Sequence, residues 1–272
     1  MKLRSLFLKH VAIPSDHGSW VFLLCPMAIG LHLGGRWTIV SVYLLVAALA
    51  GFMVRQPVTH AVKIWSGRRP SAELPAAVFW TLLFGGIASL HVAGLVIRGY
   101  GHLLWLAVPG FTVFAWHLAL VRRRNERRQV LVVMLATAVL SLTAPAAFWI
   151  GTHTADRFGW VLWALVWIQS AASILYVNMR LEQRRQGAAP DLRGRARLGI
   201  GPVRFATFNV VAVAGLAMAD LVPDLLLAPY LLQWAETIWG TLRPVTRGRP
   251  ATIGVRQLII SILFTVLFVL AY

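Results

Sequence analysis

Long apolar runs, separated by short basic segments, recur from one end of this 272-residue chain to the other. About 58% of the residues are hydrophobic and only 13% are charged, half the charged share of a typical soluble domain. A run of about 18 or more apolar residues is long enough to cross a bilayer as a helix. The pattern therefore predicts an all-α, polytopic membrane bundle of about nine transmembrane helices. The expected spans are 19–34, 37–54, 75–97, 103–121, 130–151, 159–178, 203–221, 224–240 and 256–272.

The basic residues indicate the orientation of this bundle. Of the 26 Lys and Arg residues, all but Arg36, Arg98 and Arg157 fall on one side of a nine-span arrangement. By the positive-inside rule this side is cytoplasmic, which places the N-terminus inside. We predict a multi-pass membrane protein whose basic side faces the cytoplasm. Nucleic-acid binding is not expected despite the net charge of +17, because the charge alternates with spans and no soluble segment could form such a module.

The chain reads as one integral membrane domain over residues 1–272. Residues 1–18 are expected to form an amphipathic surface helix, with Leu3, Leu6, Phe7 and Val11 on one face. Segments 55–74 and 180–202 are expected to be cytoplasmic loops, because Gly and Pro punctuate both.

Polar side chains concentrate where spans two and six reach the cytoplasmic side. Gln56, His60 and Lys63 in "RQPVTHAVK" share one face if the helix continues. Asn178 and Glu182 in "VNMRLEQRR" stand four residues apart in the same way. Polar groups at membrane depth usually face a bundle interior or a wet cavity. These two helix ends therefore predict a shared polar cavity that opens to the cytoplasm, with simple snorkelling to the interface as the alternative.

The stretch "PSDHGSW" adds Asp16 and His17 at the same expected depth. They could complete the cavity, or Asp16 could serve only as a helix N-cap. Our candidate catalytic residues are Asp16, His17, His60 and Glu182. The candidate substrate-binding residues are Gln56, Lys63, Arg68, Arg69, His117, Arg123, Asn178 and Arg185. Glu236, within an expected span, is a minor candidate for a buried polar network.

"PSDHGSW" followed by a span resembles the opening signature of the YwiC-like family of bacterial membrane proteins. The layout also resembles the UbiA superfamily of intramembrane prenyltransferases, which have nine helices and two Asp-rich motifs. "RQPVTHAVKIWSGRRP" and "VNMRLEQRRQG" are similar in position to those motifs, and "VRRRNERRQVL" to the basic segment after helix four. This resemblance implies a UbiA-like fold and an isoprenoid-like or quinone-like lipid ligand with a polar or anionic head.

The sequence departs from the UbiA pattern where magnesium would bind. The first motif has Gln56 and His60 in place of acids, and the second keeps only Glu182. Magnesium prefers carboxylate oxygens, so this is a poor two-metal site, and magnesium-dependent prenyl transfer is in doubt. Our candidate site includes no metal ligands, and the cofactor is unknown. Two ways to bind the head without a magnesium pair stay open. Arginine and lysine side chains could hold an anionic head directly, or a transition metal could be bound by Asp16, His17, His60 and Glu182. A small-solute transporter and a non-catalytic membrane factor are the alternative functions.

Overall fold

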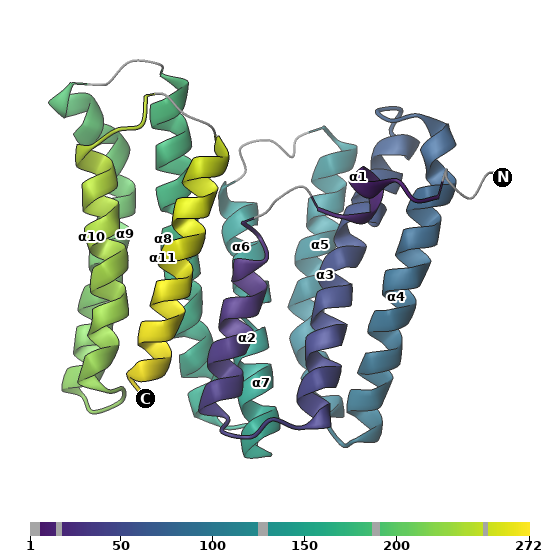
Figure 1. Cartoon of the computed structure of the whole chain (residues 1–272), viewed down its shortest axis with the longest axis horizontal. Coiled ribbons are helices and arrows are strands. Elements are labelled where there is room, and N and C mark those ends of the chain that lie inside the picture. The colour runs from purple at the N-terminus through teal and green to yellow at the C-terminus, as the bar shows by residue number, and fades with distance from the viewer. Residues whose placement is uncertain (1–5, 15–17, 125–129, 187–190, 247–249) are drawn as a thin grey trace.

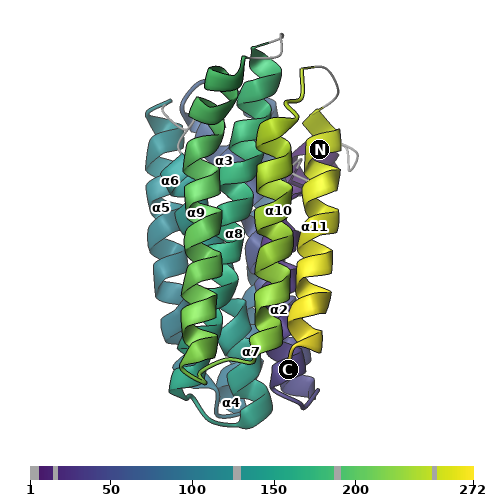
Figure 2. The same ribbon diagram turned by 90° about the vertical axis from the view of Figure 1, so that its left-hand side faces the viewer.

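The computed structural model describes residues 6–14, 18–124, 130–186, 191–246 and 250–272. Its described residues form helices joined by turns and short loops, with no strand among them. The helices lie side by side as long rods (Figure 1), and a view turned by 90° shows the same alignment (Figure 2). The predicted all-α class is confirmed.

Seven helical segments within the described residues are long and apolar enough to cross a membrane. The chain is therefore a multi-pass membrane protein. The segments are Ile39–Trp65 (α3), Ser71–Ile97 (η2 and α4), Gly101–Arg122 (η3 and α5), Val130–Thr152 (α6 and α7), Arg157–Arg185 (α8), Leu192–Met218 (α9) and Pro250–Leu270 (α11). Within them, α4 covers Leu74–Ile97, α5 Ala107–Arg122, α6 Val130–Leu140 and α7 Thr143–Thr152.

Two shorter helices correspond to the remaining expected spans. Helix α2 covers Val21–Leu33, only 13 residues, and α10 covers Leu227–Leu242 after the short turn η4, Asp224–Leu226. Both run alongside the longer helices (Figure 1). The nine-span count and the UbiA-like arrangement remain predictions, because length and composition qualify seven segments.

Most of the two expected cytoplasmic loops is helical, which corrects their boundaries. Helix α3 passes through Pro57 and ends at Trp65, α8 ends at Arg185, and α9 begins at Leu192. The Asp191 side chain caps α9 by accepting the Gly194 N–H at 2.8 Å, which satisfies a backbone donor that the first turn leaves free. Gly and Pro were therefore weaker indicators of helix ends than the capping residue. The helices extend beyond the apolar runs.

Within the described residues 6–14, the expected surface helix covers only Lys9–Ala12 (α1), and Ile13 after it is extended. Leu3, expected on its apolar face, lies outside the described residues. Pro14 explains where α1 ends, since a residue before proline is disfavoured in helical conformation. Val11 is buried against Ala61, Ala76 and Ala77, but Phe7 is 61% exposed. The short helix is thereby docked on α3 and α4.

Glycines let α2 lie directly against α7. A Cβ atom at Gly30 would stand 2.1 Å from the carbonyl oxygen of Ala144, and one at Gly151 would stand 2.5 Å from the oxygen of Gly34. Gly30 and Gly34 are one turn apart, the small-residue spacing that permits close packing between membrane helices. Helix α2 also contacts α11, so it joins the α3–α5 part of the bundle to the α8–α11 part (Figure 1).

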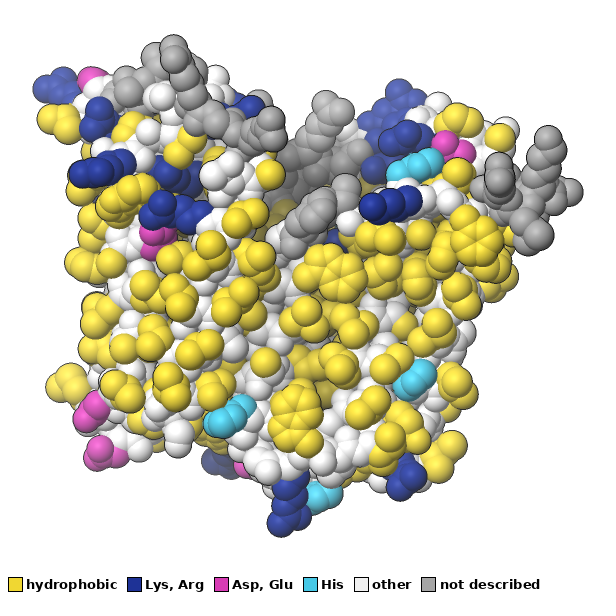
Figure 3. All heavy atoms as spheres, in the orientation of Figure 1, with side chains coloured by type: hydrophobic (Ala, Val, Ile, Leu, Met, Phe, Trp, Pro, Cys, Tyr) yellow, Lys and Arg dark blue, Asp and Glu magenta, His cyan; other side chains and the backbone are white. Residues whose placement is uncertain are grey.

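Charge gathers at one end of the molecule. Figure 3 shows Lys and Arg side chains mainly at the upper end and hydrophobic side chains over the middle. The upper end is where α3 and α8 finish, and the turns 34–38, 98–100 and 153–156 lie at the opposite end. We refer to them as the basic end and the opposite end. The positive-inside rule predicts that the basic end faces the cytoplasm.

Candidate functional site

His60 lies at the basic end in contact with residues that its own helix does not supply. Its Nε2 is 2.5 Å from Oε2 of Glu73, at the start of α4, and its ring lies 5.6 Å from the ring of His10. The other carboxylate oxygen of Glu73 is 3.4 Å from Nε2 of His10. His60 is only 5% exposed, whereas the side chain of His10 is 53% exposed. These three residues form a cluster that is buried on the His60 side and exposed to solvent on the His10 side.

Two contacts hold the N-terminal segment over this cluster. The Gln56 side chain donates to the carbonyl oxygen of His10 at 2.9 Å, and the Trp80 indole donates to that of Leu6 at 2.9 Å. Gln56 and His60 are one turn apart on α3, as the spacing predicted. One face of α3 therefore both anchors α1, through Gln56, and contributes the imidazole of His60 to the cluster.

Two arginines, the candidate Arg68 and its neighbour in the fold Arg124, connect the end of α3 to α5. Arg68 donates to the carbonyl oxygen of Val121 and, at 3.3 Å, to the hydroxyl of Ser66. Arg124 donates to the carbonyl oxygen of Ser66 at 3.4 Å. Of the other candidates here, Lys63 and His117 are half-buried, while Arg69 and Arg123 are exposed.

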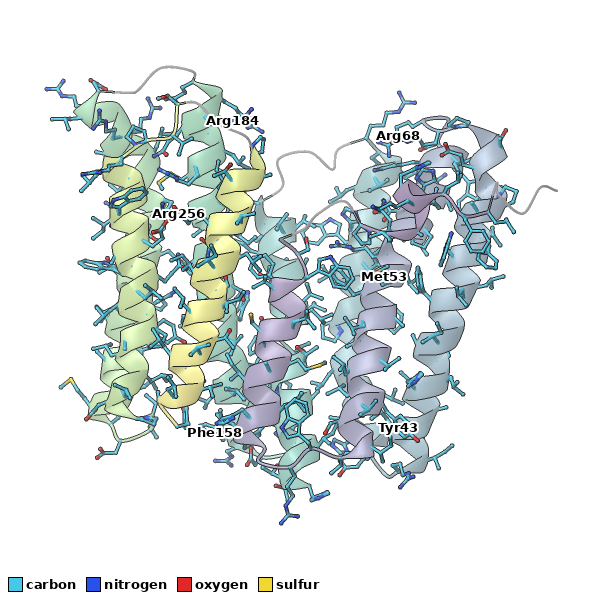
Figure 4. The ribbon with its side chains drawn as sticks, viewed as in Figure 1. Tyr43, Met53, Arg68, Phe158, Arg184 and Arg256 are labelled. Atoms are coloured by element: carbon cyan, nitrogen blue, oxygen red, sulfur yellow. The ribbon has the colours of Figure 1, made fainter. Side chains whose placement is uncertain are left out.

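The candidates on α8 belong to another part of the basic end. Glu182 pairs with Arg185 at 3.1 Å, both side chains being about half exposed. Asn178 donates to the carbonyl oxygen of Ile174, one turn back on its own helix. Figure 4 shows Arg184 of α8 and Arg68 after α3 well apart at the upper end. Among the described residues, no hydrogen bond or ion pair joins His60 to Glu182.

Asp16 and His17 lie outside the described residues, so their place relative to the cluster stays a prediction. The sequence reasoning missed His10 and Glu73. They are 63 positions apart in the chain, and only folding brings them together. The one available signal was Glu73 itself, a rare acid just after a basic segment and before a long apolar run.

A second polar network lies between α8, α10 and α11. Glu236 is 7% exposed and accepts two hydrogen bonds from Arg256, at 2.6 and 2.8 Å, and one from the hydroxyl of Tyr176. The Arg256 guanidinium lies 3.9 Å from the ring centre of Trp239. The minor expectation that Glu236 belongs to a buried polar network agrees with these contacts.

A group of buried amide side chains lies beside this network, on the same three helices. Gln257, one residue after Arg256, donates to Ser173 at 2.7 Å and to Gln233 at 3.2 Å. Gln169 also donates to Ser173, at 3.1 Å. All four residues are buried. The result is a chain of polar groups inside the apolar bundle, where such groups commonly mark a functional pathway.

A groove with many aromatic side chains lies between η3 (Gly101–Leu106), α5, α6, α7 and α8. It has a volume of about 580 Å³ and reaches inward from the opposite end. Its lining includes five tryptophans: Trp105, Trp149, Trp160, Trp163 and Trp167.

Hydrogen bonds fix the orientation of three of these indoles. Trp163 donates to the carbonyl oxygen of Ala138 at 2.9 Å, Trp167 to that of Met134 at 3.2 Å, and Trp149 to that of Asp156 at 3.2 Å. Because their N–H groups are satisfied within the protein, the half-buried rings of Trp163 and Trp167 turn apolar surface toward a ligand, whereas Trp149 is only 5% exposed. His102 is a polar residue at the margin.

Comparisons with known proteins identify relatives of this chain. The profile of the family described as YwiC-like protein matches residues 13–148, half of the chain. The uncharacterized protein YwiC of Bacillus subtilis (strain 168) is 27% identical over 180 residues, covering 65% of this chain and 70% of that protein. No solved structure gives a significant match. The matched region contains α3 and α4, and hence both His60 and Glu73.

Proposed function

The chain belongs to the YwiC-like family of membrane proteins, and we propose that it binds an isoprenoid-like or quinone-like lipid in its tryptophan-lined groove. The observation that carries this proposal is the rigid aromatic wall described above. Small-molecule sites are typically concave, mostly apolar and about 300–1,000 Å³ in volume, with few polar groups. The groove, at about 580 Å³ with His102 at its margin, has this character.

The aromatic wall favours a flat or unsaturated ligand over a saturated acyl chain. Trp163 and Trp167 are stacked with an interplanar angle of 13° and a centroid separation of 5.4 Å. Trp160 meets Trp163 edge to face, at 87°. Aromatic faces and edges of this kind pack well against other π-systems. A quinone ring or the double bonds of an isoprenoid tail would gain this contact.

The proposed position differs from the cytoplasm-facing cavity that the sequence suggested. The groove opens near the opposite end, beside the turn before Arg157, whereas the basic residues lie at the other end. In our proposal the groove takes the ring or tail of the lipid. The basic end attracts the anionic heads of surrounding lipids, as basic segments beside membrane spans do.

The proposal is limited to binding and includes no prenyl transfer. The two acids nearest the Asp-rich positions have separate partners: Glu73 contacts His60, and Glu182 pairs with Arg185. A magnesium pair that bridges a diphosphate would need carboxylates that converge on one place. These contacts do not provide that arrangement.

Quinone titration tests the proposal directly. Decylubiquinone is added to the purified protein in mild detergent, and quenching of tryptophan fluorescence is followed alongside native mass spectrometry of retained lipid. We expect saturable quenching that Trp105→Ala and Trp160→Ala each weaken at least fivefold. Trp65→Ala is the matched control, since Trp65 is 72% exposed at the end of α3 and does not line the groove. Equal, non-saturable quenching in all variants would refute the proposal.

The buried network around Glu236 favours a second candidate, proton-coupled transport of a small solute. Ionisable residues inside a bundle commonly form proton relays. Glu236, hydrogen-bonded to Tyr176, is the ionisable group of such a relay, and the buried amide group of Gln257 and Gln169 lies beside it on the same helices. Proteoliposomes loaded with a pH-sensitive dye provide the test. Proton flux that is present in the wild type and absent in Glu236→Gln would favour transport over lipid binding alone.

A further inference from the structure

We propose that His10, His60 and Glu73 form a binding site for one divalent transition-metal ion of the zinc type, which secures the N-terminal segment to α3 and α4. Candidate ligand atoms of the three residues all lie within 4.8 Å of one another. They come from three separate segments: α1, α3 and the turn before α4. This site is independent of the lipid groove, which lies at the opposite end.

One of the two measured distances matches a tetrahedral site. Zinc binds imidazole nitrogen and carboxylate oxygen at about 2.0–2.2 Å, so two ligand atoms on a tetrahedron are separated by about 3.4 Å. Nε2 of His10 and Oε1 of Glu73 are 3.4 Å apart, whereas Nε2 of His60 and Oε2 of Glu73 are at a hydrogen-bond distance of 2.5 Å. A bound ion would replace this hydrogen bond, with the Glu73 carboxylate, which is less buried than His60, turning away from the buried ring.

The ligand types select among metals. Two imidazoles and one carboxylate suit zinc, ferrous iron or cobalt, whereas magnesium and calcium prefer all-oxygen sites. Two neutral imidazoles and one carboxylate leave a bound dication with a net charge of +1. Because the His10 side chain is 53% exposed, water can occupy the remaining coordination position, as in open zinc sites.

The surroundings hold the ligands in place before a metal arrives. Gln56 holds the backbone of His10, and Val11 next to it is completely buried. Burial limits the rotation of the His60 side chain. Supporting contacts of this kind orient metal ligands and commonly change affinity 10–100-fold when removed. Gln56 is thus a positioning residue for this site.

A hydrogen-bonded cluster without metal would explain the same distances, and the two interpretations differ in a measurable way. If the cluster binds no metal, ions would bind weakly, and substitution of the three residues would not change the affinity. If the cluster is a metal site, a single ion binds, and acidification releases it because the imidazoles must be deprotonated to coordinate.

The test uses full-length protein in detergent after removal of any affinity tag. Zinc binding is measured by competition with a chromophoric chelator, and cobalt substitution reports the geometry through its visible absorption. We expect one ion per chain, and affinity reduced at least tenfold by each of His10→Ala, His60→Ala and Glu73→Gln. His91→Ala and Glu182→Gln are the controls. They remove an imidazole and a carboxylate, as the test variants do, but neither residue belongs to the cluster.

Folding of each variant is checked by size-exclusion chromatography and thermal unfolding. His10→Ala keeps the test meaningful if His60→Ala does not fold, because His10 is on a short surface helix. Hydrogen exchange of residues 8–13 gives a second readout, in which zinc should slow exchange in the wild type but not in His10→Ala. Absence of stoichiometric zinc binding, or unchanged affinity in His10→Ala, would overturn the proposal.

Discussion

Glu236 of α10 and Arg256 of α11 face each other as a two-pronged ion pair, with nitrogen–oxygen distances of 2.6 and 2.8 Å. The carboxylate is buried, whereas the arginine side chain is 42% exposed and lies over Trp239. The two residues are 20 positions apart and belong to different helices. The pair therefore fastens α10 to α11, two helices that run side by side in Figure 2.

Loss of the Glu236 charge should destabilise the protein. Removing one partner of a buried pair costs about 3–5 kcal/mol, and the half-exposed Arg256 places Glu236→Gln near the lower end of that range. Denaturant unfolding in detergent measures the change. Glu182→Gln is the matched control, because an exposed pair contributes only about 0–1 kcal/mol. Equal losses in the two variants would contradict this interpretation of the network.

The contact between α2 and α7 should not tolerate a side chain at Gly30. Valine there would collide with the backbone of Ala144, and overpacking commonly costs about 1–3 kcal/mol or more where the backbone must move. We expect Gly30→Val to lower the yield of monodisperse protein and its unfolding temperature. Gly85→Val, in α4 with open space around it, should have little effect. Similar behaviour of both variants would show that the α2–α7 contact is looser than described.

Cysteine labelling tests the expected orientation and whether α10 crosses the membrane. The native Cys25 is first replaced by serine, and single cysteines are placed at exposed positions of the two ends. Arg69→Cys and Arg243→Cys lie at the basic end, and Thr154→Cys and Asp224→Cys at the opposite end. With an impermeant maleimide added outside intact cells, only the second pair should react. Asp224→Cys and Arg243→Cys reacting from the same side would refute a crossing by α10.

Gln56 should matter for docking of the N-terminal segment more than for the fold. Gln56→Leu removes the hydrogen bond to the His10 carbonyl, a contribution of about 0.5–1.5 kcal/mol. We expect faster hydrogen exchange over residues 8–13 with little change in global unfolding. Trp65→Ala, farther along the same helix and 72% exposed, serves as the control. Unchanged exchange in Gln56→Leu would mean that Trp80 and Val11 hold the segment without it.

The sequence predicted helix positions well and residue partners poorly. Each expected span overlaps described helices, with 130–151 divided between α6 and α7, because hydropathy and basic end residues are local properties of a segment. Loop boundaries were less accurate, since α3 and α8 continue as polar helices beyond the apolar runs. The predicted cavity brought His60 and Glu182 together because both stand where a span reaches the cytoplasmic side, and the structure gives these residues different partners.

The sequence by itself determined that this protein lies in a membrane, that it is helical, and that its basic residues gather at one end. These follow from transfer free energies and backbone hydrogen bonding, which each segment must satisfy on its own in a bilayer. Only the tertiary structure decided that His10 and Glu73 meet at His60, that Arg256 pairs with Glu236, and that five tryptophans line one groove. Such contacts depend on which helix faces pack together. The packing is decided by the shapes of the two surfaces, as at Gly30 and Ala144. The periodicity of a single segment does not encode this fit between surfaces.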